Sequence, residues 1–337
     1  MRICIVGAGA IGSYLACRLA RSGVELSVLA RYARAAAIRA RGITTTFDNG
    51  DEITVRPLVA QTPEALPVQQ YVLVCVKAYA VPEAAVGFAE RLDAGSRIVF
   101  VQNGIPWWYG AEEPDDPVAD LLDPGGRLAA AIPLDRVVGC VTYANVRNAA
   151  PGIAEHVGGD SFVLGEPRGG MSPPLGRLAA LLSGAGIDAR TTGRIRDEVW
   201  LKLWGSLAFN PISALTGMTM DEIIDDPATR PIVIGMMTEG RAVATEHGVA
   251  FPTSIEQRLE TASQAGRFKT SMLQDLEAGR RLEIDAIIGA VAAMGRQVGV
   301  PTPTVDVVLG LLEQKARGLG LGGRSMPTST ALEVHRP

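Results

Sequence analysis

Residues 2–23, RICIVGAGAIGSYLACRLARSG, decide how the first half of the chain folds. Arg2–Val6 is a short apolar run with β-branched residues, which is typical of a buried parallel strand. It leads directly into a glycine-rich turn, after which residues 13–21 are predicted to be helical and Gly23 to end that helix. A strand, a G-x-G-x-x-G turn and a helix in this order predict a dinucleotide-binding site.

Each position of the turn has a predicted place at the cofactor. The first glycine allows the tight turn, the second lets the backbone approach a pyrophosphate, and the third lets the helix pack closely on the strand. The helix then offers free N–H groups to the phosphates. The predicted cofactor contacts are Gly7, Ala8, Gly9, Ala10, Ile11 and Gly12.

The second predicted strand, residues 25–30, bears on the choice of cofactor. An NAD-preferring site usually has an acidic residue at the end of this strand, but here Arg31 stands there and Arg34 follows. Arginine forms paired, charge-assisted hydrogen bonds with phosphate, which favours NADP. The alternative is an ordinary solvated arginine at a strand end.

Polar side chains follow the next two predicted strands. Residues 71–76 are an apolar run that ends at Lys77, and residues 97–101 are another that precedes Asn103. Ligands of open α/β sheets bind beyond the carboxyl ends of the strands, so both residues are candidates for ligand contact. Solvated or turn residues are the alternative.

A hairpin is predicted in residues 43–59, and the rest of this half should comprise strands 137–145, 152–157, 161–164 and 188–192 and helix 174–185.

Residues 106–135 are rich in Pro, Asp and Gly and are long for a simple connection. We expect a flap or an inserted hairpin. The segment begins with Trp107, Trp108 and Tyr109. These aromatics either fill the space between a loop and the core, which is the simpler interpretation, or contact the substrate.

From Arg194 the strand signals stop and long helical segments begin. We therefore predict an α/β N-terminal Rossmann-type dinucleotide-binding domain, residues 1–193, followed by an all-α C-terminal domain, residues 194–337. The tail from Gly318 is expected to be poorly ordered at its end. After the first helix, further helices are predicted over residues 232–247, 254–267, 282–298 and 304–315.

Residues 194–216, RIRDEVWLKLWGSLAFNPISALT, are too apolar for an ordinary surface helix. Lys202, Ser206 and Asn210 interrupt them in steps of four, which places the three side chains on one helix face. Burying a neutral polar group without a partner costs about 2–7 kcal/mol, so a polar cleft facing this stripe is predicted. Alternatively, Lys202 extends to solvent and Ser206 bonds to a carbonyl. Pro211 is expected to kink or end the helix.

Two later polar segments are open to two interpretations. Ser271 with Gln274 fits a capping box, and Glu283 in a first helical turn suits the helix dipole. From these patterns alone a structural role is the simpler interpretation for both.

Composition excludes several classes of protein. The chain has 337 residues, 47% of them hydrophobic and 20% charged, and its net charge of −4 gives no general attraction for nucleic acid or an anionic membrane. The four cysteines and three histidines lack metal-ligand spacing, so no metal site is predicted. Buried thiols and the lack of a long apolar run predict a cytoplasmic protein.

The chain resembles the ketopantoate reductase (2-dehydropantoate 2-reductase) family over nearly its whole length. The matching motifs are GAGAIG, VCVKAY, VQNG, WLKLWGSLAFNPISALTG and TSMLQDLEAGRRLEID, while HVGGDSFVLG with His156 resembles a signature of less defined role. The resemblance places Lys202 as catalytic lysine and Glu283 as active-site glutamate beside the cofactor. It implies cofactor contacts at Arg31, Lys77, Asn103 and Ala144, and substrate contacts at Asn103, Lys202, Ser206, Asn210 and Ser271.

The implied reaction is NADPH-dependent reduction of 2-dehydropantoate to pantoate, for pantothenate and coenzyme A. Lys202 would stabilise the developing alkoxide and donate a proton, while Glu283 would hold Lys202 or the substrate hydroxyl. The family often has asparagine at Ser206 and a polar residue at Met220. Two alternatives therefore stay open: a reductase of another 2-oxo acid, or an NADP-binding sensor without turnover. The expected partner is a small 2-oxo acid, and a homodimer is one assembly open to the chain.

Overall fold

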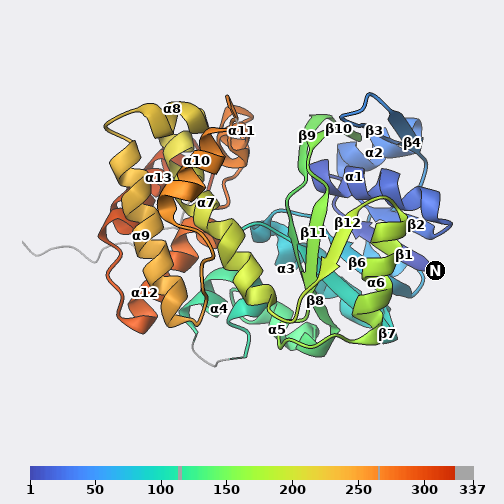
Figure 1. The fold of residues 1–337 in the computed structure, drawn as a ribbon. Coiled ribbons are helices and arrows are strands. Elements are labelled where there is room, and N and C mark those ends of the chain that lie inside the picture. The colour runs from blue at the N-terminus through green and yellow to red at the C-terminus, as the bar shows by residue number, and fades with distance from the viewer. Residues whose placement is uncertain (113–115, 265, 323–337) are drawn as a thin grey trace, which may run out of the picture.

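The computed structural model describes residues 1–112, 116–264 and 266–322 and shows a sheet domain beside a helical domain (Figure 1). The predicted fold class, a Rossmann-type α/β domain followed by an all-α domain, is confirmed. Residues 323–337, on which the prediction about the end of the tail falls, lie outside the described residues. Among the described helices, none is long and apolar enough to cross a membrane.

The main sheet has eight strands in the order β12-β11-β8-β7-β6-β1-β2-β5. Neighbouring strands are parallel except β11, which is antiparallel to β8. Alternate residues of β1 enter two apolar clusters, one on each side of the sheet, as a strand buried on both faces requires. The strands are β1 Arg2–Val6, β2 Glu25–Leu29, β5 Leu58–Ala60, β6 Gln69–Val74, β7 Leu92–Val101, β8 Val137–Thr142, β11 Ser161–Gly165 and β12 Asp188–Thr191.

A second sheet of four strands packs over α1 and contains the predicted hairpin. Its order is β4-β3-β10-β9, and β3 and β4 pair antiparallel on either side of Gly50 (φ +87°). The prediction of one strand across residues 137–145 is wrong, because the chain leaves the main sheet after Thr142 to join this one. The strands are β3 Ile43–Thr46, β4 Glu52–Val55, β9 Asn145–Ala150 and β10 Ile153–Gly158.

The two helices that were predicted in the sheet domain, α1 and α6, begin and end close to the predicted positions, whereas α2 and α3 were not predicted. α1 starts at Ala10, three residues before the predicted start, and Gly23 follows it in the left-handed conformation (φ +69°) as expected. The α-helices are α1 Ala10–Leu19, α2 Tyr32–Arg41, α3 Val81–Ala85 and α6 Pro173–Gly184. Short 3₁₀ turns are η1 Ala20–Ser22, η2 Pro63–Ala65, η3 Ala78–Ala80, η4 Val86–Arg91 and η6 Leu134–Arg136.

The described residues between β7 and β8 form a wedge of short helices packed against both domains, so the expected hairpin is wrong. It forms η5 Trp107–Tyr109, α4 Pro117–Leu122 and α5 Arg127–Ala131. All three aromatics of η5 are buried, and the Tyr109 hydroxyl accepts a hydrogen bond from Trp200 Nε1 at 2.9 Å. α4 packs against the helical domain and α5 against the sheet domain, so the wedge joins the two. The simpler interpretation of the aromatics, burial against the core, is confirmed.

The helical domain is built around α7, which runs from the sheet domain into its centre (Figure 1) and packs against α9, α11 and α13. Its elements are α7 Ile195–Thr216, α8 Met220–Asp225, α9 Arg230–Glu246, α10 Ile255–Ser263, α11 Ser271–Glu277, the π-helix η7 Asp285–Gly289, α12 Ala290–Val298 and α13 Pro303–Gly318.

Pro211 does not end α7, contrary to one of the two expected outcomes. The helix continues to Thr216 and ends at Gly217, which has φ +78°. Residues 207–214 are buried, so packing on all sides outweighs the hydrogen bond that proline removes. The Lys315 ammonium donates to the carbonyls of Ala214 and Leu215 at 2.7 and 3.0 Å, which satisfies the end of the helix.

Candidate active site

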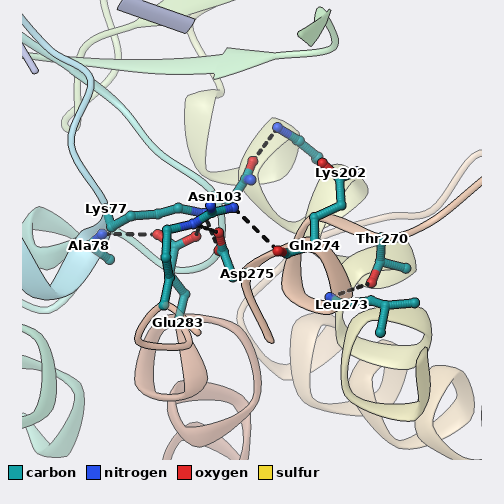
Figure 2. Close-up of polar contacts among 10 residues, drawn as sticks. Lys77, Ala78, Asn103, Lys202, Thr270, Leu273, Gln274, Asp275 and Glu283 are labelled. Atoms are coloured by element: carbon teal, nitrogen blue, oxygen red, sulfur yellow. Dashed lines mark hydrogen bonds and ion pairs between the residues drawn. The ribbon is translucent and has the colours of Figure 1, made fainter. Parts of the chain in front are cut away.

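One lysine of α7 reaches across to the carboxyl edge of the parallel sheet. The Lys202 ammonium donates hydrogen bonds to the side-chain oxygen of Asn103, after β7, and to the carbonyl of Thr142, at the end of β8 and 2.5 Å away. Figure 2 shows Lys202 pointing at Asn103. Two neutral oxygens thus hold the ammonium, and no carboxylate of the described residues forms an ion pair with it.

The surroundings of Lys202 change its acidity. Burial lowers the pKa of the ammonium from 10.5 to about 8; the Cys140 thiol and Glu283 oppose this effect, and Lys77 adds to it. A proton donor is most useful when its pKa lies near the working pH. The arrangement therefore suits transfer of a proton to a substrate oxygen.

Asn103 is held in place by the glycine that follows it. Gly104 has φ +80°, and a methyl group there would lie 2.3 Å from the carbonyl oxygen of Ala286 in η7. The next amide, Ile105 N–H, donates to that same oxygen at 2.8 Å. The π-helical turn thus offers a carbonyl to the loop, as π-turns near functional sites often do.

A second charged cluster connects the two domains. The Lys77 ammonium, after β6, lies 2.7 Å from Asp275 Oδ2 and 2.9 Å from Glu283 Oε2. The other oxygen of Glu283 accepts the Ala78 N–H at 2.9 Å. Burial opposes charge on Lys77, yet the Glu283 and Asp275 carboxylates raise its pKa above the ordinary value, so the ammonium stays charged. Figure 2 shows this cluster beside Asn103.

The contacts of Glu283 differ from one expectation, that its carboxylate holds Lys202. Its oxygens face Lys77 and Ala78, whereas Lys202 is held by Asn103 and Thr142. Glu283 directly precedes the helical residues that begin at position 284, as the helix-dipole interpretation requires, and a contact with the substrate hydroxyl stays a prediction. In this structure Glu283 fixes the chain after β6 relative to the helical domain.

Asp275 is a site residue that sequence reasoning missed. Its side chain is only 6% exposed, and it pairs with Arg280 at 2.8 Å as well as with Lys77. The available signal was an acidic residue between two leucines of α11, with a basic residue five positions later.

The predicted capping box at Ser271 is wrong. Thr270 is the N-cap of α11 and accepts the Leu273 N–H at 3.2 Å, while Gln274 donates to the carbonyl of Lys269 at 2.9 Å. Ser271 is the first helical residue, and α11 packs against α7. The hydroxyl of Ser271 is therefore not used as the helix cap.

The remaining predicted substrate residues lie on the stripe that the sequence suggested. Ser206 is partly buried and Asn210 is 7% exposed, both on the face of α7 that carries Lys202. Their roles stay predictions.

The glycine turn has the geometry that a dinucleotide requires. A methyl group on Gly12 would lie 2.0 Å from the Gly7 carbonyl oxygen, and one on Gly7 (φ +93°) would lie 2.5 Å from Val76 Cγ1. A methyl on Gly9, the N-cap of α1, would meet no atom within 4 Å, so the open side of the turn is at the helix N-terminus. Of the other residues, Ala8 is buried, while Ala10 and Ile11 form the partly exposed first turn of α1.

The two arginines after β2 occupy different places. Arg31 pairs with Glu83 at 3.0 Å on the surface, with 42% of its side chain exposed. Arg34 lies against the glycine turn, where its guanidinium donates to the Ala8 carbonyl at 2.6 Å. Burial, and secondarily Arg280 from the helical domain, lower the pKa of Arg34. A basic region therefore covers the end of β2 and the turn.

Two further positions from the sequence differ in character. Ala144 lies just beyond β8, with its N–H donating to Thr142 Oγ1 at 3.2 Å, next to the carbonyl that holds Lys202. His156 is buried against Tyr14 of α1, and this contact holds the second sheet to that helix. Its ring nitrogen also forms a hydrogen bond with the Gly159 carbonyl at 2.6 Å. The first lies in the site; the second contributes to packing.

A glycine turn on a parallel sheet, with a partly buried lysine brought to the sheet edge by a helical domain, defines a dinucleotide-dependent oxidoreductase. The family model of ketopantoate reductase PanE/ApbA matches residues 3–169, and that of its C-terminal part matches residues 194–316. The chain belongs to the ketopantoate reductase family.

Individual relatives agree with this assignment. The 2-dehydropantoate 2-reductase of Mesorhizobium japonicum is 43% identical, covering 94% of this chain and 98% of its own. The crystal structure described as that of a putative ketopantoate reductase from Ralstonia solanacearum MolK2 has a TM-score of 0.89 to this one. It is 40% identical in sequence, over 95% of this chain and 99% of that one. D-mandelate dehydrogenase, solved with NADH and anilino(oxo)acetate, shares the fold at 21% identity, with a TM-score of 0.81 over 96% of this chain and 100% of that one.

Proposed function

We propose that this protein is an NADP-dependent reductase that converts 2-dehydropantoate to pantoate, in the synthesis of pantothenate and coenzyme A. The observation that carries the proposal is Lys202, a buried ammonium of lowered pKa held at the edge of a dinucleotide-binding sheet. Family membership and the 43% identity to a 2-dehydropantoate 2-reductase support the choice of substrate.

In the proposed reaction, bound NADPH supplies the hydride to the ketone carbon. Lys202 stabilises the oxygen on which negative charge develops and then donates its proton there. Asn103, which now accepts from Lys202, exchanges that contact for one with the substrate. Neutral hydrogen bonds from Ser206, Asn210 and Ser271 orient the rest of the substrate. Glu283 acts indirectly, by holding Lys77 and the turn after β6 in place.

NADP is proposed over NAD because basic groups surround the end of β2. No acidic residue follows that strand directly, and a phosphate dianion would compete with Glu83 for Arg31, since exposed ion pairs are weak. The glycine turn, whose open side lies at Gly9, accepts the pyrophosphate common to both cofactors.

Oxidation of NADPH over a panel of 2-oxo acids tests the proposal. 2-Dehydropantoate should give the highest kcat/KM; a higher value for another acid would make the protein a reductase of that acid. Absence of turnover with every acid, together with tight NADPH binding, would favour the non-catalytic sensor.

The role of Lys202 is tested with Lys202→Ala in the same assay. Loss of a positioned acid should lower kcat by about 10²–10⁴-fold. NADPH affinity, measured by fluorescence titration, should change little because the glycine turn lies on the other domain. Near-normal turnover would remove Lys202 from the reaction.

Two broader properties belong to the proposal. The four cysteines are unpaired, three of them buried, which fits the reducing conditions of the cytoplasm. A homodimer stays a prediction.

A further inference from the structure

Arg258 of α10 reaches the catalytic helix without taking part in any of the contacts described above. Its guanidinium lies against the backbone of α7 at Gly205: a methyl group on Gly205 would be 2.8 Å from Nη2, 3.5 Å from Cζ and 3.6 Å from Nε. Gly205 is three residues after Lys202 and immediately before Ser206. The absence of a side chain at position 205 therefore leaves room for a cation beside the polar stripe.

This cation has no counter-charge in the described part of the chain. Arg258 forms neither a hydrogen bond nor an ion pair with residues 1–112, 116–264 or 266–322, although it is only partly exposed. Burial lowers the pKa of Arg258, but an arginine stays charged at neutral pH. A partly desolvated charge without a partner costs stability, so a purely structural role would leave that cost without compensation.

Tyr143 links Arg258 to Lys202. The Lys202 ammonium lies 6.0 Å from the centre of the Tyr143 ring, and the same tyrosine acts electrostatically on Arg258. Burial and the nearby Glu198 carboxylate raise the pKa of Tyr143 to about 12, against the opposing effect of Arg258 and, secondarily, of Arg190. The phenol is thus neutral at working pH and does not neutralise the guanidinium.

The geometry points to Arg258 as the group that binds the carboxylate of the 2-oxo acid, while Lys202 contacts the ketone oxygen. This inference rests on the proposed function. In a 2-oxo acid the carboxylate is bonded directly to the ketone carbon. One substrate can therefore present one oxygen to Lys202 and a pair of oxygens to a second cation near the same tyrosine. A guanidinium fork matches a carboxylate with two parallel hydrogen bonds, which a lysine in its place would not reproduce.

The test compares a charged substrate with a neutral one. 2-Dehydropantoate closes to a lactone that keeps the ketone and lacks the carboxylate charge. Arg258→Met should lower kcat/KM for the acid by about 10–150-fold, the value of a charge-assisted hydrogen bond, and should change kcat/KM for the lactone by less than about threefold. The loss should lie mainly in KM, and Arg258→Lys should recover only part of it.

Two further variants separate binding from folding. Arg241→Met removes an exposed arginine of the neighbouring α9 and should leave both substrates unaffected. Gly205→Ala keeps the charge of Arg258 but places a methyl group 2.8 Å from its Nη2, so the guanidinium must shift. KM for the acid should rise, while the melting temperature should be unchanged or higher because alanine favours the helix.

Equal losses with acid and lactone, or no loss with either, would overturn the inference. If the wild type reduces no 2-oxo acid at all, the proposed function fails separately. Arg258 is then judged by titration of pantoate into the enzyme with NADP, followed by tryptophan fluorescence. Binding that Arg258→Met leaves unchanged would contradict the assignment; binding that weakens at least tenfold would support it.

Discussion

Lys202 is partly buried, and in the proposed reaction it carries a proton, so its pKa decides the pH range in which it can act. Burial disfavours the ammonium, so its pKa falls to about 8 in the folded protein from 10.5. The acid form therefore predominates below about pH 8 and is lost as the pH rises above that value. We expect kcat/KM for ketone reduction to fall about tenfold per pH unit above that value.

The reverse reaction provides the control for this pH dependence. Oxidation of pantoate needs the neutral amine, so its kcat/KM should rise over the same pH range. A reduction profile that stays flat to pH 10 would show that the donor is another group.

Arg31 and Arg34 make separable predictions about the cofactor. In the proposed complex Arg31 contacts the phosphate on the adenosine ribose of NADPH. Arg31→Ala should therefore weaken the binding of NADPH by about 10–150-fold and leave the binding of NADH nearly unchanged. Arg34 bonds the Ala8 carbonyl in the turn, so Arg34→Ala should weaken both cofactors. Fluorescence titrations of both cofactors measure this; equal weakening of both by Arg31→Ala would place Arg31 at the shared pyrophosphate or in the fold.

Among the elements, the loop after β7 depends on a contact with η7 that no sequence pattern indicates. Gly104→Ala would place a methyl group 2.3 Å from a backbone oxygen at φ +80°. We expect a loss of about 1–3 kcal/mol in unfolding free energy and a fall in kcat, because Asn103 moves away from Lys202. Urea unfolding and turnover measure the two effects.

Gly50→Ala is the matched control for this loop. Its φ is similar, +87°, but a methyl group there meets nothing within 4 Å. It should cost only the backbone strain, about 1 kcal/mol, with normal turnover. If Gly104→Ala were as active as Gly50→Ala, the docking of the loop on η7 would not position Asn103.

Elements that depend on local patterns were predictable from the sequence. The strand, glycine turn and helix at the N-terminus and the polar stripe of α7 follow from spacing alone, and the structure has them. Features set by tertiary contact were not predictable. α7 passes through Pro211 because it is packed on all sides, and the π-turn of η7 has no sequence signature. The cap of α11 is instead a local feature, and it lies one residue before the predicted one, at Thr270 rather than Ser271.

The same distinction applies to the candidate site. Lys77 and Asn103 were expected at one edge of the sheet because parallel strands end there, and they follow the paired parallel strands β6 and β7. The hydrogen bond between Asn103 and Lys202 of α7 was not predicted from the strand pattern. Asp275 and Arg258 become visible only when helices distant in sequence are brought together. The partner of Glu283 was also inaccessible from the sequence, since Lys77 lies 206 residues away.

At the scale of the whole molecule, one of the two apolar clusters spans both domains. A single cluster of buried residues includes Phe100 of the sheet, Trp108 of the wedge and Trp200 of α7. All four tryptophans of the chain belong to this cluster, so their fluorescence reports on the junction between the domains. Far-UV circular dichroism reports on helices and strands everywhere.

We therefore expect both signals to give the same urea midpoint, because opening the junction exposes the core of both domains. Lys77→Met should lower the two midpoints together. This change leaves the Glu283 carboxylate with the Ala78 N–H as its hydrogen-bond partner, and we expect the free energy of unfolding to fall by about 1–3 kcal/mol. The loss is smaller than for a fully buried ion pair because the Lys77 side chain is 36% exposed. A fluorescence transition that precedes the dichroism transition in the wild type would mean that the domains separate before they unfold. If the fluorescence and dichroism transitions separated only in Lys77→Met, the ion pairs rather than the shared apolar cluster would hold the two domains together.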